Sequence, residues 1–496
     1  MDNFLEKIRS EAENSRFAIR ASEEGTVLSV GDGIVHVAGL RDARLYELLE
    51  LEGGDCGIVF DMSEESMGVV LLTETNGAKA GDKVYKTDRI ASVAVGESLL
   101  GRVVNPLGTP VDGGPSPDRT VSCPVERQAP PLPWRDFVNQ PLYTGIRLID
   151  SMLPIGRGQR ELIIGDPSTG KTSIGIDAIT NQKHSDVISV YVAIGQKKSH
   201  VSKIISELGS YGDFSRTVAV VADASDSLGL QYLAPYSATA IAEYFMDRGR
   251  DVLVVYDDLT KHADAYRSLS LLLRRPPGRE AYPGDIFFIH SRLLERSAKL
   301  SQRHGGGSIT AIPIVETQQG RISSYIPTNL ISITDGQIYL DISLYNKGIR
   351  PAIDVGKSVS RIGGKAQVDA MKAVAERLKI DYSRFIEVEV FTKFGAHVEE
   401  ETARLIRRGE RLREILKQPR FRPCSPEEIV VNILILETGI LDALELSAVE
   451  RFCGEIAGRT VSAFPEIMDR ISRDGRFGKN EAVKLKDFIA REGGAA

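Results

Sequence analysis

The sequence of 496 residues has little of the chemistry that marks several broad classes of protein. It contains one tryptophan and only four cysteines, and these cysteines lie far apart without a C-x-x-C pair: Cys56, Cys123, Cys424 and Cys453. Such spacing argues against a disulfide framework or a structural zinc site and favours a reducing compartment. We therefore expect four free thiols.

Long apolar runs and a basic excess are also missing. The strongest apolar run, 429–436, contains Asn432 and is much shorter than the roughly 18 residues that span a bilayer. The first part of the sequence mixes acidic and basic side chains, unlike a signal or transit peptide. The net charge of −6 makes nucleic acid a poor expectation as partner. We expect a protein of a cytosol-like compartment that reaches a membrane only through partners.

The sequence texture changes along its length and predicts a multidomain α/β protein. Residues 1–22 form an N-terminal extension, expected as an amphipathic helix or a loose segment. Between 23 and 91, short β-branched runs alternate with glycine-containing turns, which is typical of a small β-barrel or sandwich. In 92–366, four near-continuous apolar runs indicate buried parallel strands: 161–164, 187–193, 217–221 and 252–256.

Residues 367–496 are mainly helical in pattern. Leu405, Leu412 and Leu416 recur at helical spacing. In contrast, 386–391 alternates like a strand, so both helix and strand stay open for that segment.

The most specific motif is a phosphate-binding loop of the form G-x-x-x-x-G-K-[ST]. Glycines let backbone N–H groups surround phosphate oxygens, while Lys171 adds a positive charge and Thr172 can ligate Mg²⁺. An apolar strand, 162–164, precedes the loop and a helical stretch, 173–179, follows it, whereas a chance glycine-rich turn would not require this order. The candidate nucleotide-binding residues are Gly165, Asp166, Pro167, Ser168, Thr169, Gly170, Lys171, Thr172 and Ser173.

A carboxylate expected to act on the same metal follows a later strand. The apolar run 252–256 is followed by Asp257 and Asp258. Asp257 is best placed to orient the water shell of Mg²⁺, although a surface Asp pair that opens a turn is the alternative. The sequence therefore predicts a site for Mg²⁺ with ATP or ADP.

Several further motifs, in this order and at these separations, resemble the α subunit of F-type ATP synthases. They are PIGRGQRELIIG at 154–165, AIGQKKS at 193–199, YDDLTK at 256–261, LLRRPPGREAYPGD at 272–285, SITDGQ at 332–337, GIRP at 348–351 and SVSRIGG at 358–364. The resemblance runs from about residue 25 to the C-terminus. It implies an N-terminal β-barrel, a central RecA-like P-loop domain with a mostly parallel sheet, and a C-terminal helical bundle.

The resemblance also implies partners and a location. Three copies would alternate with three β subunits around a central γ rotor, with peripheral stalk subunits attached. The complex would lie at the cytoplasmic face of a bacterial inner membrane, or at an equivalent organellar membrane, and would contact the membrane only through partners.

Two residues determine how, by the resemblance, nucleotide binding and catalysis are divided between this chain and its β partner. Gln196 stands where the catalytic β relatives carry a glutamate, and an amide cannot accept a proton from the attacking water. The isolated chain should therefore bind nucleotide and be nearly inactive, unless Gln196 is merely a polar strand-end residue and the base lies elsewhere. Arg361, with Ser360 beside it, is implied as an arginine finger in the neighbouring β subunit's catalytic site, with a surface arginine paired to an acid as the alternative. Such a finger is worth roughly 10³ to 10⁵ in rate.

Other positions match the family less closely. Pro167 and Ser168 replace the usual Arg-Gln pair of the loop, and Arg420 replaces a neutral polar residue. The shortened extension, 1–22, puts its usual attachment to the stalk in doubt. These departures indicate a divergent branch in which Na⁺ is an alternative to H⁺ as coupling ion. Three positions are implied to line the adenine pocket: Arg350, Pro351 and Gln418.

A self-sufficient homohexameric RecA-like ATPase, such as a secretion-type motor or an RNA translocase, is the alternative function. Such a motor needs a catalytic glutamate and a trans arginine in one polypeptide, whereas this sequence has Gln196. A translocase also needs a basic, aromatic RNA site, which 25–90 lacks. A purely structural module is disfavoured because Lys171, Thr172 and Asp257 are intact. We expect a largely non-catalytic α subunit for ATP synthesis or hydrolysis coupled to H⁺ or Na⁺ transport.

Overall fold

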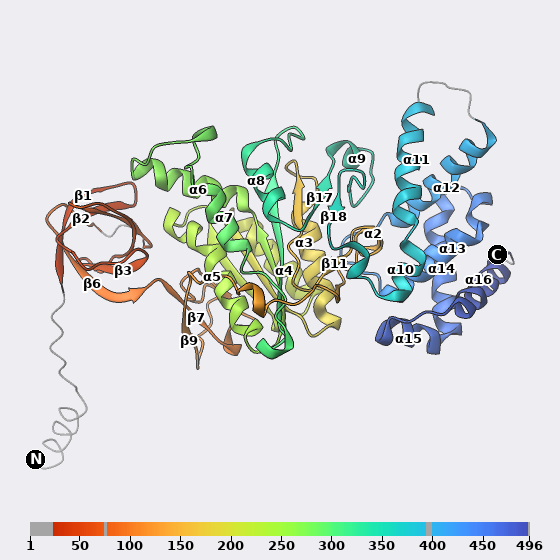
Figure 1. Ribbon diagram of the computed structural model, residues 1–496, viewed down its shortest axis with the longest axis horizontal. Helices are drawn as coiled ribbons and strands as arrows, with labels where there is room; N and C mark the ends of the chain where they lie inside the picture. The colour runs from red at the N-terminus through yellow and green to blue at the C-terminus, as the bar shows by residue number, and fades with distance from the viewer. Residues whose placement is uncertain (1–22, 74–76, 393–398, 495–496) are drawn as a thin grey trace, which may run out of the picture. The chain divides into compact units, whose positions relative to one another are not determined.

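The computed structural model describes residues 23–73, 77–392 and 399–494 (Figure 1). These residues form two compact units that divide after Ala91. The extension at 1–22 lies outside the described residues. All four cysteines are free, as predicted. In the part of the protein that is described, no helix has the length and apolar character needed to cross a membrane.

The first unit is a closed β-barrel in which every neighbouring pair of strands is antiparallel. Around the barrel the order is β1-β2-β5-β4-β3-β6. Alternate side chains such as Val35, Val37 and Leu49 are fully buried and fill the interior. This barrel confirms the prediction from the short β-branched runs. The strands are β1 (Glu24–Gly31), β2 (Ile34–Ala38), β3 (Glu47–Leu51), β4 (Cys56–Met62), β5 (Met67–Leu71) and β6 (Lys83–Ile90).

The second unit is built on a sheet of eight strands in the order β18-β17-β12-β16-β15-β13-β14-β8. Of these strands only β18 runs antiparallel to its neighbour; the other pairs are parallel. The four predicted apolar runs form β12, β13, β14 and β15, whereas β8, β16 and β17 were not predicted. The strands are β8 (Val103–Val104), β12 (Leu162–Gly165), β13 (Ile188–Gln196), β14 (Thr217–Asp223), β15 (Asp251–Asp257), β16 (Ser308–Glu316), β17 (Gly336–Leu340) and β18 (Val359–Ser360). Two small sheets join β7 (Ser92–Val95) to β9 (Val121–Pro124) and β10 (Pro141–Leu142) to β11 (Ile155–Gly156).

The chain runs outward along the sheet from β12 to β14 and then back toward β17. Because crossovers between parallel strands are right-handed, reversing the direction places the later helices on the opposite face of the sheet. The outward crossovers are α3 (Lys171–Asn181) and α4 (Lys198–Tyr211), which contact each other. The returning crossovers are α5 (Leu228–Met246), α6 (Leu259–Leu272), α7 (Ile286–Leu294) and α8 (Tyr325–Ile333). Two short helices complete this part: α2 (Arg147–Met152) and α9 (Ile342–Asn346). The carboxyl ends of the parallel strands meet at one edge, which is where ligands bind in such sheets.

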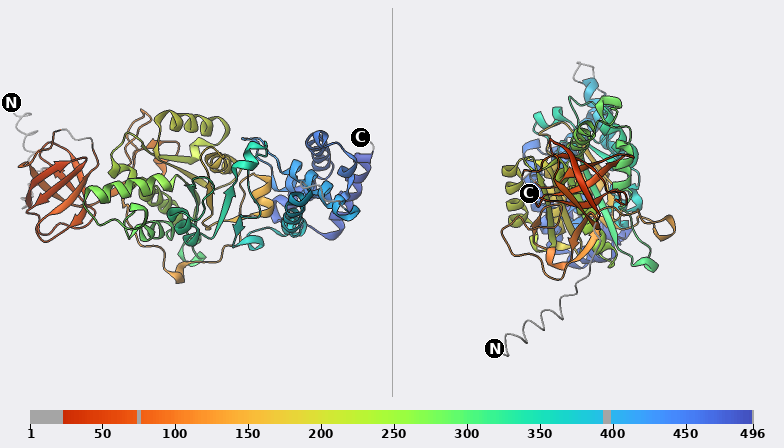
Figure 2. Two further views of the ribbon diagram at one scale, coloured as in Figure 1. Left: turned by 90° about the horizontal axis from the view of Figure 1, so that it is seen from above. Right: turned by 90° about the vertical axis from the view of Figure 1, so that its left-hand side faces the viewer.

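The C-terminal helices form one bundle, drawn in teal to blue in Figure 2. Its centre is α13, whose run 429–436 is buried and which contacts α10, α12, α14, α15 and α16. The same apolar core continues through α2 into the sheet, so the bundle and the sheet share one interior. The helices are α10 (Asp369–Ala375), α11 (Leu378–Thr392), α12 (Glu400–Leu416), α13 (Pro426–Thr438), α14 (Leu446–Ala463), α15 (Pro465–Asp474) and α16 (Lys479–Gly494).

The strand-like segment 386–391 lies within helix α11. This helix packs closely on α12, where Phe385 is fully buried beside Gly409. A Cβ on Gly409 would lie 2.0 Å from Phe385 Cγ, so only glycine permits this approach. Tertiary packing therefore overrides the local preference of alternating β-branched residues for a strand.

Candidate nucleotide-binding site

The predicted phosphate-binding loop connects β12 to α3 and has the backbone that its glycines suggest. Ser168 and Gly170 have positive φ angles of 63° and 100°. A Cβ on Gly165 would lie 2.8 Å from the carbonyl oxygen of Leu340, so the loop could not run so close to β17 with a larger residue. Thr169 braces the turn by donating to the carbonyl oxygen of Asp166 at 2.7 Å.

The carboxylate of Asp166 points away from the loop interior and ties the loop to the segment after β16. It accepts hydrogen bonds from Thr317 Oγ1 at 2.7 Å and from Gly320 N at 2.8 Å. Asp166 therefore shapes the site and leaves backbone N–H groups and Lys171 to meet phosphate oxygens.

Lys171 begins α3 and is nearly buried. Its Nζ donates to the carbonyl oxygen of Asp166 at 2.8 Å and lies 3.4 Å from Glu316 Oε1. Glu316 ends β16, and sequence reasoning missed it because only the parallel sheet brings this strand end beside the loop. The Glu316 carboxylate thus pairs with the Lys171 ammonium group, which a bound phosphate would also need.

Thr172 and Asp257 form the predicted pair of oxygen ligands for a metal. Thr172 Oγ1 donates to Asp257 Oδ2 at 2.9 Å, and the hydroxyl of Tyr191 donates to the same oxygen at 2.9 Å. Burial raises the pKa of Asp257, while these hydrogen bonds oppose that shift. Among the described residues, no group of three or more His, Cys, Asp and Glu could hold a metal by itself. The pair suits Mg²⁺, which needs few protein ligands when phosphates and waters supply the others.

Gln196 lies beside this pair at the end of β13. Its Nε2 donates to Asp257 Oδ1 at 3.3 Å, and its Oε1 accepts from Lys261 Nζ at 3.0 Å. The neighbouring Asp258 caps α6 by accepting from Lys261 N at 2.9 Å. Burial and the nearby Asp257 raise the pKa of Asp258 to about 7. An amide with both ends bonded therefore lies beside the Thr172–Asp257 pair.

One cavity of about 960 Å³ joins these groups to the predicted adenine pocket. Pro167, Ser168 and Ser173 also line it. The walls include Arg350 and Pro351 from the segment after β17, and Gln418 from the segment after α12. Three segments that are distant in sequence contribute to its walls: 167–173, 345–352 and 417–420. Residues at strand ends, such as Gln196, Asp257 and Glu316, also line it.

The residues predicted to line the adenine pocket differ in how far their side chains are engaged by other protein groups. Arg350 lies over the ring of Tyr345, with 4.7 Å from its Cζ to the ring centroid. The Gln418 amide is fully engaged, because Nε2 donates to Gly145 O at 2.7 Å and Oε1 accepts from Arg147 N at 2.9 Å. Gln418 therefore supports the wall through its backbone and amide contacts.

Sequence reasoning missed an aromatic and acidic group beside this wall. The rings of Tyr211 and Phe421 stack with centroids 4.1 Å apart. Arg420 pairs with Glu207 at 3.0 Å, and its Cζ lies 4.4 Å from the Phe421 ring centroid. Asp177 lines the cavity and accepts from Phe421 N at 3.2 Å, while burial raises the pKa of Asp177 to about 6. The departure at Arg420 was the signal in the sequence, but its partners came from other helices.

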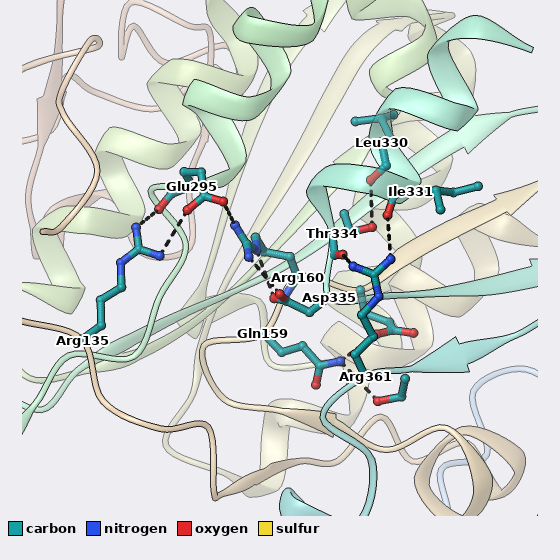
Figure 3. Close-up of polar contacts among 11 residues, drawn as sticks. Arg135, Gln159, Arg160, Glu295, Leu330, Ile331, Thr334, Asp335 and Arg361 are labelled. Atoms are coloured by element: carbon teal, nitrogen blue, oxygen red, sulfur yellow. Dashed lines mark hydrogen bonds and ion pairs between the residues drawn. The ribbon is translucent and has the colours of Figure 1, made fainter. Parts of the chain in front are cut away.

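Arg361 does not line this cavity; it follows β18 and is exposed. Figure 3 shows its guanidinium at the end of α8, where it donates to Thr334 O at 3.1 Å and Ile331 O at 3.4 Å. Carbonyl groups at a helix C-terminus lack helical partners and carry partial negative charge. Among the described residues, the structure thus places the Arg361 guanidinium on backbone carbonyl oxygens at the end of α8.

The backbone on either side of Arg361 is fixed by the fold. The Arg361 N donates to Asp335 O at 2.9 Å, and the Asp335 carboxylate is gripped by Arg160 at 2.8 and 3.0 Å. Arg160 also pairs with Glu295, which binds Arg135, as the row of dashed lines in Figure 3 shows. The preceding Ser360 Oγ donates to the carbonyl oxygen of Pro154 at 2.8 Å, so this hydroxyl serves the turn itself.

A phosphate-binding loop at the carboxyl edge of a mostly parallel sheet defines a nucleotide-binding protein of the P-loop class. Models of the ATP synthase alpha/beta family match the sequence in three parts. The beta-barrel domain matches 21–88, the nucleotide-binding domain matches 145–360, and the C-terminal domain of the family matches 367–492. The protein belongs to the ATP synthase alpha/beta family, among its α subunits.

Relatives resemble the protein over nearly its whole length. ATP synthase subunit alpha of Caldanaerobacter subterraneus subsp. tengcongensis is 52% identical over 476 residues, which cover 96% of this chain and 94% of that protein. The same subunit of Petrotoga mobilis is 51% identical over 491 residues, or 98% of this chain and 97% of that protein. That of Dehalococcoides mccartyi is 50% identical over 467 residues, covering 94% and 93%. The protein is therefore a nucleotide-binding subunit of an enzyme that makes ATP.

Proposed function

We propose that this protein is a largely non-catalytic α subunit in the soluble head of a rotary F-type ATP synthase and supplies Arg361 in trans to a β-subunit catalytic site. One observation carries the proposal: the phosphate-binding loop faces Gln196, whereas the exposed Arg361 lies outside that cavity. The subunit thus has a nucleotide site without a base and an exposed cation away from the nucleotide. Each half of this arrangement is incomplete for hydrolysis without a second subunit.

The subunit's own site would hold Mg²⁺ with ATP or ADP. Lys171 and the loop N–H groups would bind phosphate oxygens, while Thr172 and Asp257 would hold the metal, the latter through water. Bound Mg²⁺ neutralises part of the phosphate charge. Gln196 can orient a water molecule but takes no proton from it, so bound nucleotide would persist and stabilise the subunit.

Arg361 would act on the nucleotide of the neighbouring β subunit. A guanidinium can neutralise charge that develops on a transferred phosphoryl group, an effect of roughly 10³ to 10⁵ in rate. The carbonyl oxygens of Thr334 and Ile331 hold the side chain with ordinary hydrogen bonds, so it can exchange them for stronger bonds to phosphate oxygens. Ser360 would position this arginine by fixing the turn that carries it, through its hydrogen bonds to Pro154 O and Gly363 N.

The remaining partners follow from membership of the family. We propose an alternating ring with β subunits around a γ rotor, with peripheral stalk subunits attached and H⁺ or Na⁺ as coupling ion. The complex would lie at the cytoplasmic face of a bacterial inner membrane, or at an equivalent organellar membrane.

The test compares the isolated subunit with the same subunit assembled with a β partner. The isolated subunit should bind MgATP and show negligible turnover, because Gln196 cannot act as base. In the complex, Arg361→Ala should lower the hydrolysis rate by about 10³-fold or more. Arg451→Ala removes an exposed arginine of α14 and should leave the rate unchanged. Robust hydrolysis by the isolated subunit would overturn the proposal and favour a self-sufficient homohexamer.

A further inference from the structure

A buried carboxyl group lies beneath the turn that carries Arg361. Glu161 immediately precedes β12 and its side chain is completely inaccessible to solvent. Its Oε2 accepts a hydrogen bond from Gln159 Nε2 at 2.7 Å, whereas its Oε1 has no hydrogen-bond partner among the described residues. A buried carboxylate oxygen without a partner is costly, so this group calls for an explanation.

The surroundings of Glu161 connect it to Arg361. Gly336 packs against the carboxyl group, because a Cβ there would lie 2.4 Å from Glu161 Oε2 and 2.3 Å from Val359 O. In the sheet, Gly336 is paired with Ser360, the residue before the arginine. The carboxyl group therefore lies against the β17–β18 pair where the Arg361 turn begins.

A series of hydrogen bonds completes the connection. Gln159 Nε2 lies 3.4 Å from Ser360 Oγ, and Ser360 Oγ also accepts from Gly363 N at 3.2 Å beyond the arginine. Glu161 fixes the Gln159 amide, and that amide meets the hydroxyl that closes the turn. Figure 3 shows Gln159 reaching toward the base of Arg361.

We propose that Glu161 is a positioning residue for Arg361, acting through Gln159 and Ser360 to hold the arginine turn in place. The inference rests on the proposed role of Arg361 in a β-subunit site. Glu161 itself lies too deep to touch a nucleotide, so its effect would appear in the rate of the partner's reaction and not in the nucleotide affinity of this subunit.

The charge of Glu161 would affect Arg361, because the charged groups that face Glu161 include one acidic and two basic side chains. These are Asp335 after α8, Lys379 in α11 and Arg361 itself. Burial raises the pKa of Glu161 well above its usual range. As pH rises through this pKa, an ionised Glu161 would attract the guanidinium inward and away from the carbonyl groups of α8. When Glu161 is protonated this attraction is absent, and Arg361 keeps its hydrogen bonds to the carbonyl oxygens of Thr334 and Ile331.

The experiment uses the subunit assembled with its β partner and measures kcat and KM for ATP from about pH 6 to about pH 9. Glu161→Gln keeps the shape and the acceptor for Gln159 but cannot ionise. Its kcat should stay within about twofold of wild type at the acidic end of this range, and should lack the decline toward higher pH that ionisation of Glu161 gives wild type. Glu161→Leu removes the acceptor, and kcat should fall at least about tenfold, since a misplacement of about 1 Å can cost about 100-fold.

Controls separate positioning from loss of structure. MgATP affinity of the subunit's own site should stay within about twofold in both variants, because ground-state binding there does not use Arg361. Glu455→Gln removes an exposed carboxylate of α14 and should change nothing. If Glu161→Leu does not fold, the pH profile of Glu161→Gln decides alone.

Three outcomes are decisive. A wild-type pH profile identical to that of Glu161→Gln, or full kcat in Glu161→Leu, would overturn the positioning role. If Arg361→Ala lowers turnover while both Glu161 variants behave as wild type, this inference fails and the proposed function stands. If Arg361→Ala has no effect, the proposed function fails and the role of Glu161 fails with it.

Discussion

Glu316 pairs with Lys171 of the predicted phosphate-binding loop, and we expect removal of the Glu316 charge to tighten nucleotide binding. Glu316 Oε1 lies 3.4 Å from Lys171 Nζ; the lysine side chain is 5% exposed and the glutamate side chain 35% exposed. A phosphate group needs the same Nζ and is repelled by the same carboxylate. Glu316→Gln removes both effects with little change of shape.

The size of the effect follows from the geometry. Two unit charges 3.4 Å apart attract with about 5 kcal/mol at an effective dielectric constant of about 20. Solvent reaches one third of the glutamate, and exposed pairs are typically worth no more than about 1 kcal/mol, so the lower figure decides. A change of about 1 kcal/mol corresponds to about a fivefold lower Kd for MgATP.

Titration calorimetry of both proteins with MgATP measures this difference directly. The gain should shrink at high salt, because screening weakens the partly exposed charge. Glu450→Gln is the matched control, since Glu450 also lines the cavity. An unchanged or weaker affinity in Glu316→Gln would refute the reasoning and place Glu316 among the groups that hold the nucleotide.

Three further predictions concern stability. Arg296→Met should lower the free energy of unfolding by about 3 to 5 kcal/mol in denaturant titrations. The substitution leaves the buried Glu243 carboxylate without the two hydrogen bonds of 2.8 Å that it accepts from Arg296. The control Arg451→Met, at an exposed position, should cost less than about 0.5 kcal/mol. The free energy of unfolding should fall as pH rises from about 4 to about 6. Burial raises the pKa of Asp177 to about 6 in the folded state, so the unfolded state loses this proton at lower pH. If Asp177→Asn kept the wild-type dependence of unfolding free energy on pH, this expectation would be contradicted. Gly409→Ala should lower the midpoint of thermal unfolding, because its Cβ overpacks the α11–α12 contact at a cost of about 1 to 3 kcal/mol, while no loss would show that α11 shifts freely.

Local sequence patterns predicted most of the fold. The barrel and the buried strands β12, β13, β14 and β15 were predicted, because period-two alternation and continuous apolar runs reflect how many faces of a strand are buried. The neighbouring strands β16 and β17 were not predicted. The segment 386–391 could not be assigned, because its alternation is compatible with a strand, and a helix results only from the close contact at Gly409. Strand β8 was missed for a similar reason, since two residues in a loop-rich stretch give no periodicity.

The site divides in the same way. Lys171, Thr172 and Asp257 follow from strand-loop-helix order and strand ends, and the structure brings all three together. Tyr191 was hidden inside an apolar strand, where an aromatic residue predicts core packing and not a hydroxyl bonded to Asp257. The role of Glu316 depends on which strand lies beside β12, and no local pattern contains that information.

The walls of the nucleotide cavity come from both the sheet part and the segment that joins α12 to α13 within the helical bundle. A nucleotide that touches 167–173 and 417–420 together would be a non-covalent cross-link between the two, and its binding energy would add to their cohesion. Loss of nucleotide would weaken the bundle's attachment first, before the barrel or the sheet is affected. Exchange of the bundle between related proteins would then alter nucleotide retention, even though every phosphate-binding residue stays the same.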